Sequence, residues 1–113
     1  MLATLASVTA VSASGPAYVF WFIEQLAAAG TALGLEPGAS AQLALETVLG
    51  SAKLAAAAKE PPSVLRERVT SRGGTTAAAL KVFEDEALAE RFKRAIEAAS
   101  RRGTEMGDLL GRD

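Results

Sequence analysis

The segment from Pro16 to Gly34 has the pattern of one helix that is apolar on nearly every side. Proline suits its first position, because the N–H groups of a first turn have no partner within the helix. The apolar residues fill three adjacent strips, which are Tyr18, Phe22, Leu26 and Leu33, then Val19, Ile23, Ala27 and Gly30, then Phe20 with Trp21. Such a helix is buried on most of its sides, and a small domain has few places to bury one. The segment therefore predicts a partner chain.

The same run, extended to Leu35, is long enough to raise the question of a membrane span. Glu24 and Gln25 lie in its middle, where a charge costs about 2.5–3.5 kcal/mol in a bilayer. The start of the chain, from Met1 to Ala6, lacks the basic residues of a secretory signal. We therefore expect a soluble, cytoplasmic protein with no membrane partner.

Further helical patterns follow, separated by proline or glycine. The expected helices run from Pro37 or Ala41 to Ala58, from Pro62 to Val69, from Thr75 to Glu84, and from Glu86 to Leu110. The last is amphipathic, and its spacing predicts exposed pairs from Glu90 to Arg94 and from Glu97 to Arg101. We expect one all-α domain over residues 1–113, a bundle of about five helices.

The N-terminal segment is less regular. Ser14 precedes the first helix and is a candidate cap. Residues 8–11 could be extended, although the segment is too short to define a sheet. The last residues, from Gly107 onward, are expected to fray.

Composition excludes several functions. The chain has 12 basic and 13 acidic residues and a net charge of −1, so no basic excess favours nucleic acid. It has no cysteine and no histidine. Catalysis by a Ser-His-Asp or Cys-His arrangement is therefore ruled out, and we expect no metal site.

One polar stretch interrupts the helices at Ser71, Arg72, Gly73, Gly74, Thr75 and Thr76. Two glycines allow positive φ and a close approach to the backbone. The next helix begins with unpaired N–H groups and a partial positive charge, an arrangement that suits a carboxylate or phosphate. On local chemistry alone, a glycine cap followed by a threonine N-cap is the commoner explanation.

Two stretches together resemble one family. Residues 8–18, Val-Thr-Ala-Val-Ser-Ala-Ser-Gly-Pro-Ala-Tyr, resemble the start of the C-terminal domain of pyrroline-5-carboxylate reductase. Residues 62–84, with their Thr-Ser-x-Gly-Gly-Thr-Thr loop, resemble the signature of that family. Gly34-Leu35 and residues 48–53 are also similar, and the order and separation match from about Val8 to Met106.

This resemblance implies an enzyme that transfers a hydride from NADPH or NADH to the imine carbon of Δ1-pyrroline-5-carboxylate, which gives L-proline. It implies a helical domain that interlocks with its copy in a homodimer, and it leaves open the assembly of dimers into larger oligomers. It also implies that Ser71, Gly73, Gly74, Thr75 and Thr76 bind the substrate carboxylate, with Thr76 near the imine nitrogen as the catalytic candidate. The anion site argued from local chemistry then becomes the favoured interpretation.

Some features depart from the family pattern. The resemblance implies an N-terminal Rossmann domain for the dinucleotide, and we expect it to be absent from this chain, because no G-x-G-x-x-G follows a strand. We therefore expect no cofactor bound by this chain alone and no turnover from it. Arg72 stands where proline is usual, Ala13 where glycine is usual, and Ala6 where aspartate is common. The alternative is a helical oligomerisation module without catalytic activity. A small enzyme of unrelated type is disfavoured, because Lys53 is a lone lysine and no paired carboxylates stand out.

Overall fold

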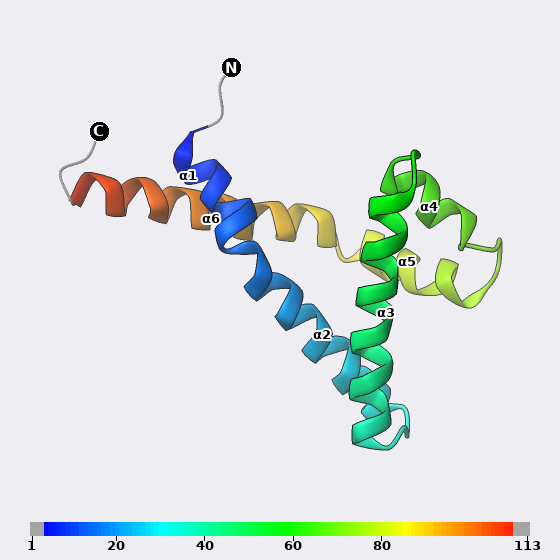
Figure 1. Cartoon of the computed structure of the whole chain (residues 1–113). Helices are drawn as coiled ribbons and strands as arrows, with labels where there is room; N and C mark the ends of the chain where they lie inside the picture. The colour runs from blue at the N-terminus through cyan, green and yellow to red at the C-terminus, as the bar shows by residue number, and fades with distance from the viewer. Residues whose placement is uncertain (1–3, 110–113) are drawn as a thin grey trace. The chain divides into compact units, whose positions relative to one another are not determined.

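A computed structural model describes residues 4–109 of the chain. These residues form α-helices and one π-helix, and no strand is found among them (Figure 1). In chain order the elements are α1 (Leu5–Val8), the π-helix η1 (Thr9–Ala13), α2 (Gly15–Ala32), α3 (Pro37–Ala57), α4 (Pro62–Arg68), α5 (Thr75–Asp85) and α6 (Leu88–Leu109). The all-α prediction is confirmed, and the five expected helices correspond to α2 through α6.

The N-terminal segment differs from the prediction. Residues 8–11 are not extended, because they lie in α1 and η1. Ser14 has helical dihedral angles at the end of η1, and its carbonyl accepts from Ala17 N–H at 3.1 Å. An N-cap has an extended backbone, so Ser14 is not the cap that the sequence suggested.

The last helix also begins later than predicted. Ala87 adopts a left-handed conformation with φ of 55° and separates α5 from α6. The acidic run Glu84–Glu86 therefore ends α5 rather than starting α6, and Glu90 is the acidic residue in the first turn of α6. Helix α6 continues through Leu109, so fraying of residues 107–109 stays a prediction, and residues 110–113 lie outside the described part.

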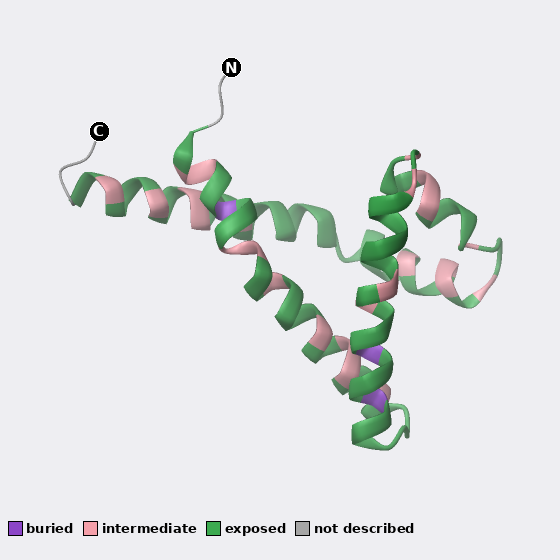
Figure 2. Ribbon diagram, viewed as in Figure 1, coloured by how far each residue is buried: buried purple, intermediate pink, exposed green. Residues whose placement is uncertain are grey.

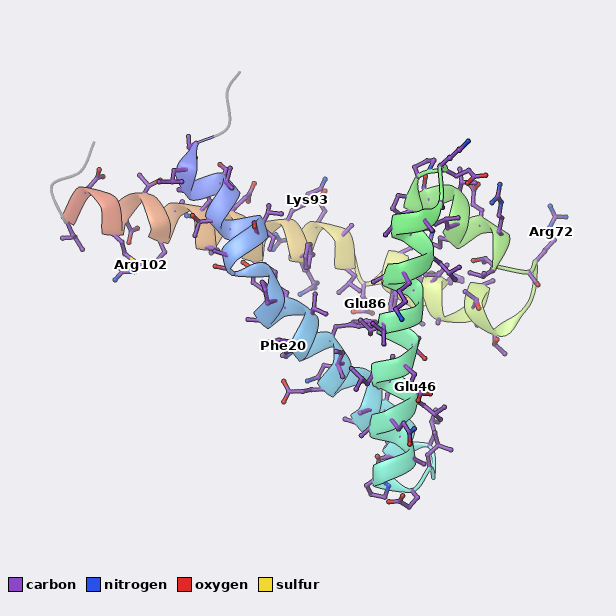
Figure 3. The ribbon with its side chains drawn as sticks, in the orientation of Figure 1. Phe20, Glu46, Arg72, Glu86, Lys93 and Arg102 are labelled. Carbon is purple, nitrogen blue, oxygen red and sulfur yellow. The ribbon has the colours of Figure 1, made fainter. Side chains whose placement is uncertain are left out.

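The ion pairs of α6 are not the predicted ones. Within the described residues, Lys93 pairs with Glu90 at 3.8 Å and Arg102 with Glu105 at 3.3 Å, both three residues apart. All four side chains are exposed, and Figure 3 labels Lys93 and Arg102 among them. Exposed pairs are worth little, so neighbouring partners on one face exchange easily.

The described residues fall into two compact units. The first unit contains those up to Tyr18 together with those from Leu80 onward, and in it α1 and η1 pack against α6 (Figure 1). The hydroxyl of Tyr18 donates to the carbonyl oxygen of Ala10 in η1 at 2.8 Å. The Tyr18 ring meets Phe92 of α6 edge-on, with centroids 6.3 Å apart. Tyr18 thus ties the π-helix and the start of α2 to α6.

The second unit is Val19–Ala79, in which the end of α2 turns back into α3. Gly34 makes this turn with φ of 105°, as expected for a glycine after a helix. Glu36 caps α3, because its carboxylate accepts from the N–H groups of Gly38 and Ala39 at 2.7 and 3.1 Å. The Ser40 hydroxyl donates to the carbonyl of Ala27 in α2 at 2.7 Å, which fixes the crossing of the two helices.

Little of the described chain is buried. Ala10, Ala44 and Ser40 are 1–2% exposed, and no other described residue is classed as buried (Figure 2). Large apolar side chains remain exposed on every helix except α4, among them Leu5, Phe20, Trp21, Leu54, Phe92 and Leu109. The helices therefore present apolar surface that the described residues of this chain do not cover.

Candidate functional site

The polar stretch follows directly on α4. Pro61 precedes this helix with an extended backbone, and Pro62 occupies its first position. At the other end, Thr70 closes the helix, because its Oγ1 donates to the carbonyl of Arg66 at 2.6 Å. Thr70 therefore has a structural role, although it adjoins the hydroxyls of the candidate site.

A tight turn connects α4 to α5. The N–H of Gly74 donates to the carbonyl of Ser71 at 3.0 Å, and Gly73 between them has φ of 73°. This left-handed conformation at the third position of a turn favours glycine. Gly74 is favoured for a different reason, since a Cβ there would lie 3.2 Å from the Ser71 carbonyl oxygen, a tight contact that the turn would have to relieve.

Helix α5 begins at Thr75, and its cap is not a threonine. The carbonyl of Gly74 accepts from Ala78 N–H at 3.2 Å, which places Gly74 at the N-cap position. The N–H groups of Thr75, Thr76 and Ala77 therefore have no carbonyl within the helix. Among the described residues, no side chain accepts a hydrogen bond from them either, so three donors are available at the turn.

The five predicted site residues thus lie together on one turn and the helix start after it. Ser71, Gly73 and Thr75 are exposed, whereas Gly74 and Thr76 are half-buried. The charge of the segment also suits an anion, because no acidic residue occurs between Glu67 and Glu84. The turn, which we call the Ser71–Thr76 turn, combines hydroxyls, free amides and the positive end of a helix.

An ion pair joins the segment before α4 to the end of that helix, which leads into this turn. Arg68, the last residue of α4, donates to Glu60 at 2.8 Å. This hydrogen bond, with further ones from backbone amides, holds the pKa of Glu60 below its ordinary value of 4.5. The charge of Arg68 is thereby compensated, and both side chains remain largely exposed.

Neither a metal site nor a dinucleotide site is found among residues 4–109. Within residues 4–109, no group of three or more acidic side chains is placed to hold a metal ion. The same residues form no strand, and the sequence has no G-x-G-x-x-G, so they do not fit a dinucleotide in the usual manner.

The second candidate for function is the apolar surface of α2 and α3. Phe20, Trp21 and Leu54 are 64%, 61% and 70% exposed in the single chain. By length and composition alone, the helical run Leu5–Ala32 could also cross a membrane, and only 6% of its apolar 18-residue stretch is buried in the single chain. A core helix of a soluble protein passes the same test, so this finding by itself does not place the chain in a membrane.

The described residues thus form an all-α fold with exposed apolar helices and one polar turn that carries free amide donors. The sequence matches the family described as "Pyrroline-5-carboxylate reductase dimerisation" over residues 3–106. The chain belongs to this family.

Named relatives agree with this assignment. A pyrroline-5-carboxylate reductase of Pseudomonas aeruginosa is 42% identical over 109 residues, and one of Synechocystis is 45% identical over 101 residues. These matches cover 96% and 89% of this chain but only 40% and 38% of the relatives. The chain therefore spans less than half the length of these relatives.

Solved structures show the same fold. Pyrroline carboxylate reductase of Plasmodium falciparum, determined with NADP bound, aligns with a TM-score of 0.87 at 36% identity. The alignment covers 91% of this chain and 39% of that protein. The reductase of Coxiella burnetii aligns with a TM-score of 0.86 at 39% identity, covering 92% of this chain and 40% of the other.

Proposed function

We propose that this chain is the dimerisation and substrate-binding part of a pyrroline-5-carboxylate reductase. The enzyme reduces Δ1-pyrroline-5-carboxylate to L-proline in the last step of proline biosynthesis. The observation that carries this proposal is the family match over residues 3–106, with relatives of that name up to 45% identical. The Ser71–Thr76 turn supports it independently, since the substrate is a carboxylate.

Each residue of the turn has a separate role in this proposal. The free amides of Thr75 and Thr76 bind the carboxylate, and the hydroxyls of Ser71 and Thr75 add donors at the exposed edge. Gly73 and Gly74 keep the backbone accessible. The half-buried Thr76 lies nearest the imine nitrogen, where its hydroxyl assists proton delivery.

The partner in this proposal is a second copy of the chain. Two copies that exchange their α2 and α3 faces would cover Phe20, Trp21 and Leu54, each worth about 1.5–3 kcal/mol on full burial. A family described by dimerisation supports this choice of partner. The interlocked homodimer is then a soluble, cytoplasmic protein, and apolar α2 is a buried interface helix that needs no lipid.

The reaction needs a hydride donor that these residues do not fit. NADPH or NADH supplies the hydride in the reductase, and the residues that hold it are not among those described here. This chain contributes the donors that hold the substrate carboxylate in place, a hydroxyl that delivers a proton, and a dimer that excludes water. We expect the purified 113-residue chain to show no reduction of pyrroline-5-carboxylate with NADPH.

Ligand binding tests the site without requiring turnover. L-Proline, titrated into the 113-residue chain, should shift the amide resonances of residues 71–76 and slow their hydrogen exchange. Thr76→Ala should weaken this response, and in an active reductase that contains this chain it should slow turnover by up to about 10²–10⁴-fold. Amides that do not respond would contradict the site, and an unchanged turnover rate would leave Thr76 with positioning alone.

A further inference from the structure

We propose that Arg72 determines ligand specificity at the Ser71–Thr76 turn, by adding a positive charge that favours anionic ligands over uncharged ones of the same shape. This inference rests on the proposed carboxylate site. It gives a role to a residue that departs from the family pattern, in which proline is usual.

The position of Arg72 follows from the turn geometry. It is the second residue of the turn that the Ser71 carbonyl and the Gly74 amide close at 3.0 Å. The left-handed Gly73 follows Arg72, and the free amides of α5 begin two residues after Gly73, at Thr75. The side chain is exposed and extends outward from the connection between α4 and α5 (Figure 3). Arg72 thus adds an exposed positive charge to the turn that precedes the free amides.

The charge of Arg72 is not compensated within the described structure. No ion pair or hydrogen bond between described residues involves its side chain, whereas Arg68 is paired with Glu60 and Lys81 with Asp85, both at 2.8 Å. No acidic residue lies between Glu67 and Glu84 to neutralise it through the chain. Guanidinium groups bind carboxylates through paired N–H donors, so Arg72 is chemically suited to the ligand.

The size of the effect is limited by solvent. Exposed ion pairs change an equilibrium by up to about five-fold, and salt screens them. We therefore expect Arg72 to change the affinity for a carboxylate by about two- to five-fold at low ionic strength, and to have no effect in molar salt. For an uncharged ligand the side chain should make no difference at any salt concentration.

The test compares two ligands on the 113-residue chain by the amide shifts of residues 71–76. The ligands are tetrahydrofuran-2-carboxylate, an anion with a five-membered ring and no amine, and tetrahydrofuran-2-carboxamide, which has the same shape and is uncharged. The variants are Arg72→Gln, Arg72→Lys and the matched control Arg66→Gln, which removes an exposed charge from neighbouring α4. Circular dichroism verifies that each variant keeps its helix content.

The expected result has three parts. Arg72→Gln lowers the preference for the carboxylate over the amide two- to five-fold in low salt, Arg72→Lys retains most of it, and Arg66→Gln leaves it unchanged. Three results would overturn the proposal while leaving the carboxylate site intact. They are an unchanged preference in Arg72→Gln, an equal loss of preference in Arg66→Gln, and a loss of preference that persists in molar salt. A wild-type chain whose turn amides ignore tetrahydrofuran-2-carboxylate would instead contradict the proposed site itself, and this inference with it.

Discussion

Gly30→Ala tests how closely α2 and α3 approach within the second unit. A Cβ on Gly30 would overlap the hydroxyl oxygen of Ser40 and lie 3.3 Å from the Ser40 Cβ. Ser40 is 2% exposed, and its hydroxyl donates to the Ala27 carbonyl at 2.7 Å. The alanine therefore displaces a buried hydroxyl from its partner.

Two opposing free energies set the result. Alanine in place of glycine stabilises a helix interior by about 0.5–1 kcal/mol. A buried hydroxyl that loses its hydrogen bond costs about 1–3 kcal/mol. The Ala27 carbonyl is less affected, because Thr31 Oγ1 also donates to it at 3.2 Å. We expect Gly30→Ala to lower the free energy of unfolding by about 1 kcal/mol.

The background Ser40→Ala reverses the expected sign. With the hydroxyl removed, the new Cβ meets only the methyl carbons of residue 40 and of Leu35, the latter at 3.2 Å. Small shifts of these side chains relieve such contacts, so the helix-propensity gain remains. Gly30→Ala should then be neutral or stabilising by up to about 1 kcal/mol.

The assay is urea unfolding of the 113-residue chain, followed by circular dichroism and by Trp21 fluorescence. Protein concentration must be identical in all four members of the cycle, because self-association contributes to apparent stability. A coupling of about 1–2 kcal/mol between the two positions is expected. If Gly30→Ala is equally stabilising in both backgrounds, α2 and α3 do not pack as described.

Three further changes test other parts of the structure. Tyr18→Phe removes the donor to the Ala10 carbonyl, so it should cost about 1 kcal/mol and speed hydrogen exchange of the η1 amides, and unchanged exchange would contradict this role. Gly73→Ala forces alanine into φ of 73°, which should cost about 1–2 kcal/mol in urea unfolding with no steric overlap involved, and an unaltered midpoint would refute the turn conformation. The lowered pKa of Glu60 means that its pair with Arg68 stabilises the fold above pH 4.5 and that this contribution is lost as the pH falls through the folded-state value. The stability of Glu60→Gln should accordingly fall less than that of the wild type between neutral pH and pH 3, and identical pH profiles would argue against a stabilising pair.

The sequence predicts the helices well wherever proline or glycine marks their ends. Pro37 and Pro62 open α3 and α4 at the expected positions, and Gly34 ends the α2 segment. These signals are local, because they act through φ and through missing N–H groups. That the five candidate residues lie on one turn is also predictable, since they fall within six consecutive positions of the chain, while their role in binding stays a prediction.

The remaining features depend on contacts that sequence spacing does not encode. The π-helix η1 is stabilised by the Tyr18 hydroxyl, which comes from eight residues away. Ala87 takes a left-handed conformation that alanine rarely adopts, and nothing in its local sequence predicts this. The N-cap of α5 is Gly74 rather than a threonine, because the turn closed by Ser71 already determines where the helix begins.

The central claim is that a second copy of this chain covers the exposed apolar helices, and sedimentation equilibrium tests it most directly. Phe20→Glu places a charge on α2 at a side chain that is 64% exposed in the single chain, and Lys93→Glu is a control on the polar face of α6 (Figure 3). We predict that the wild type and Lys93→Glu are dimers at micromolar concentration, whereas Phe20→Glu dissociates and loses helix content. A wild-type chain that is monomeric and fully helical at that concentration would contradict the claim.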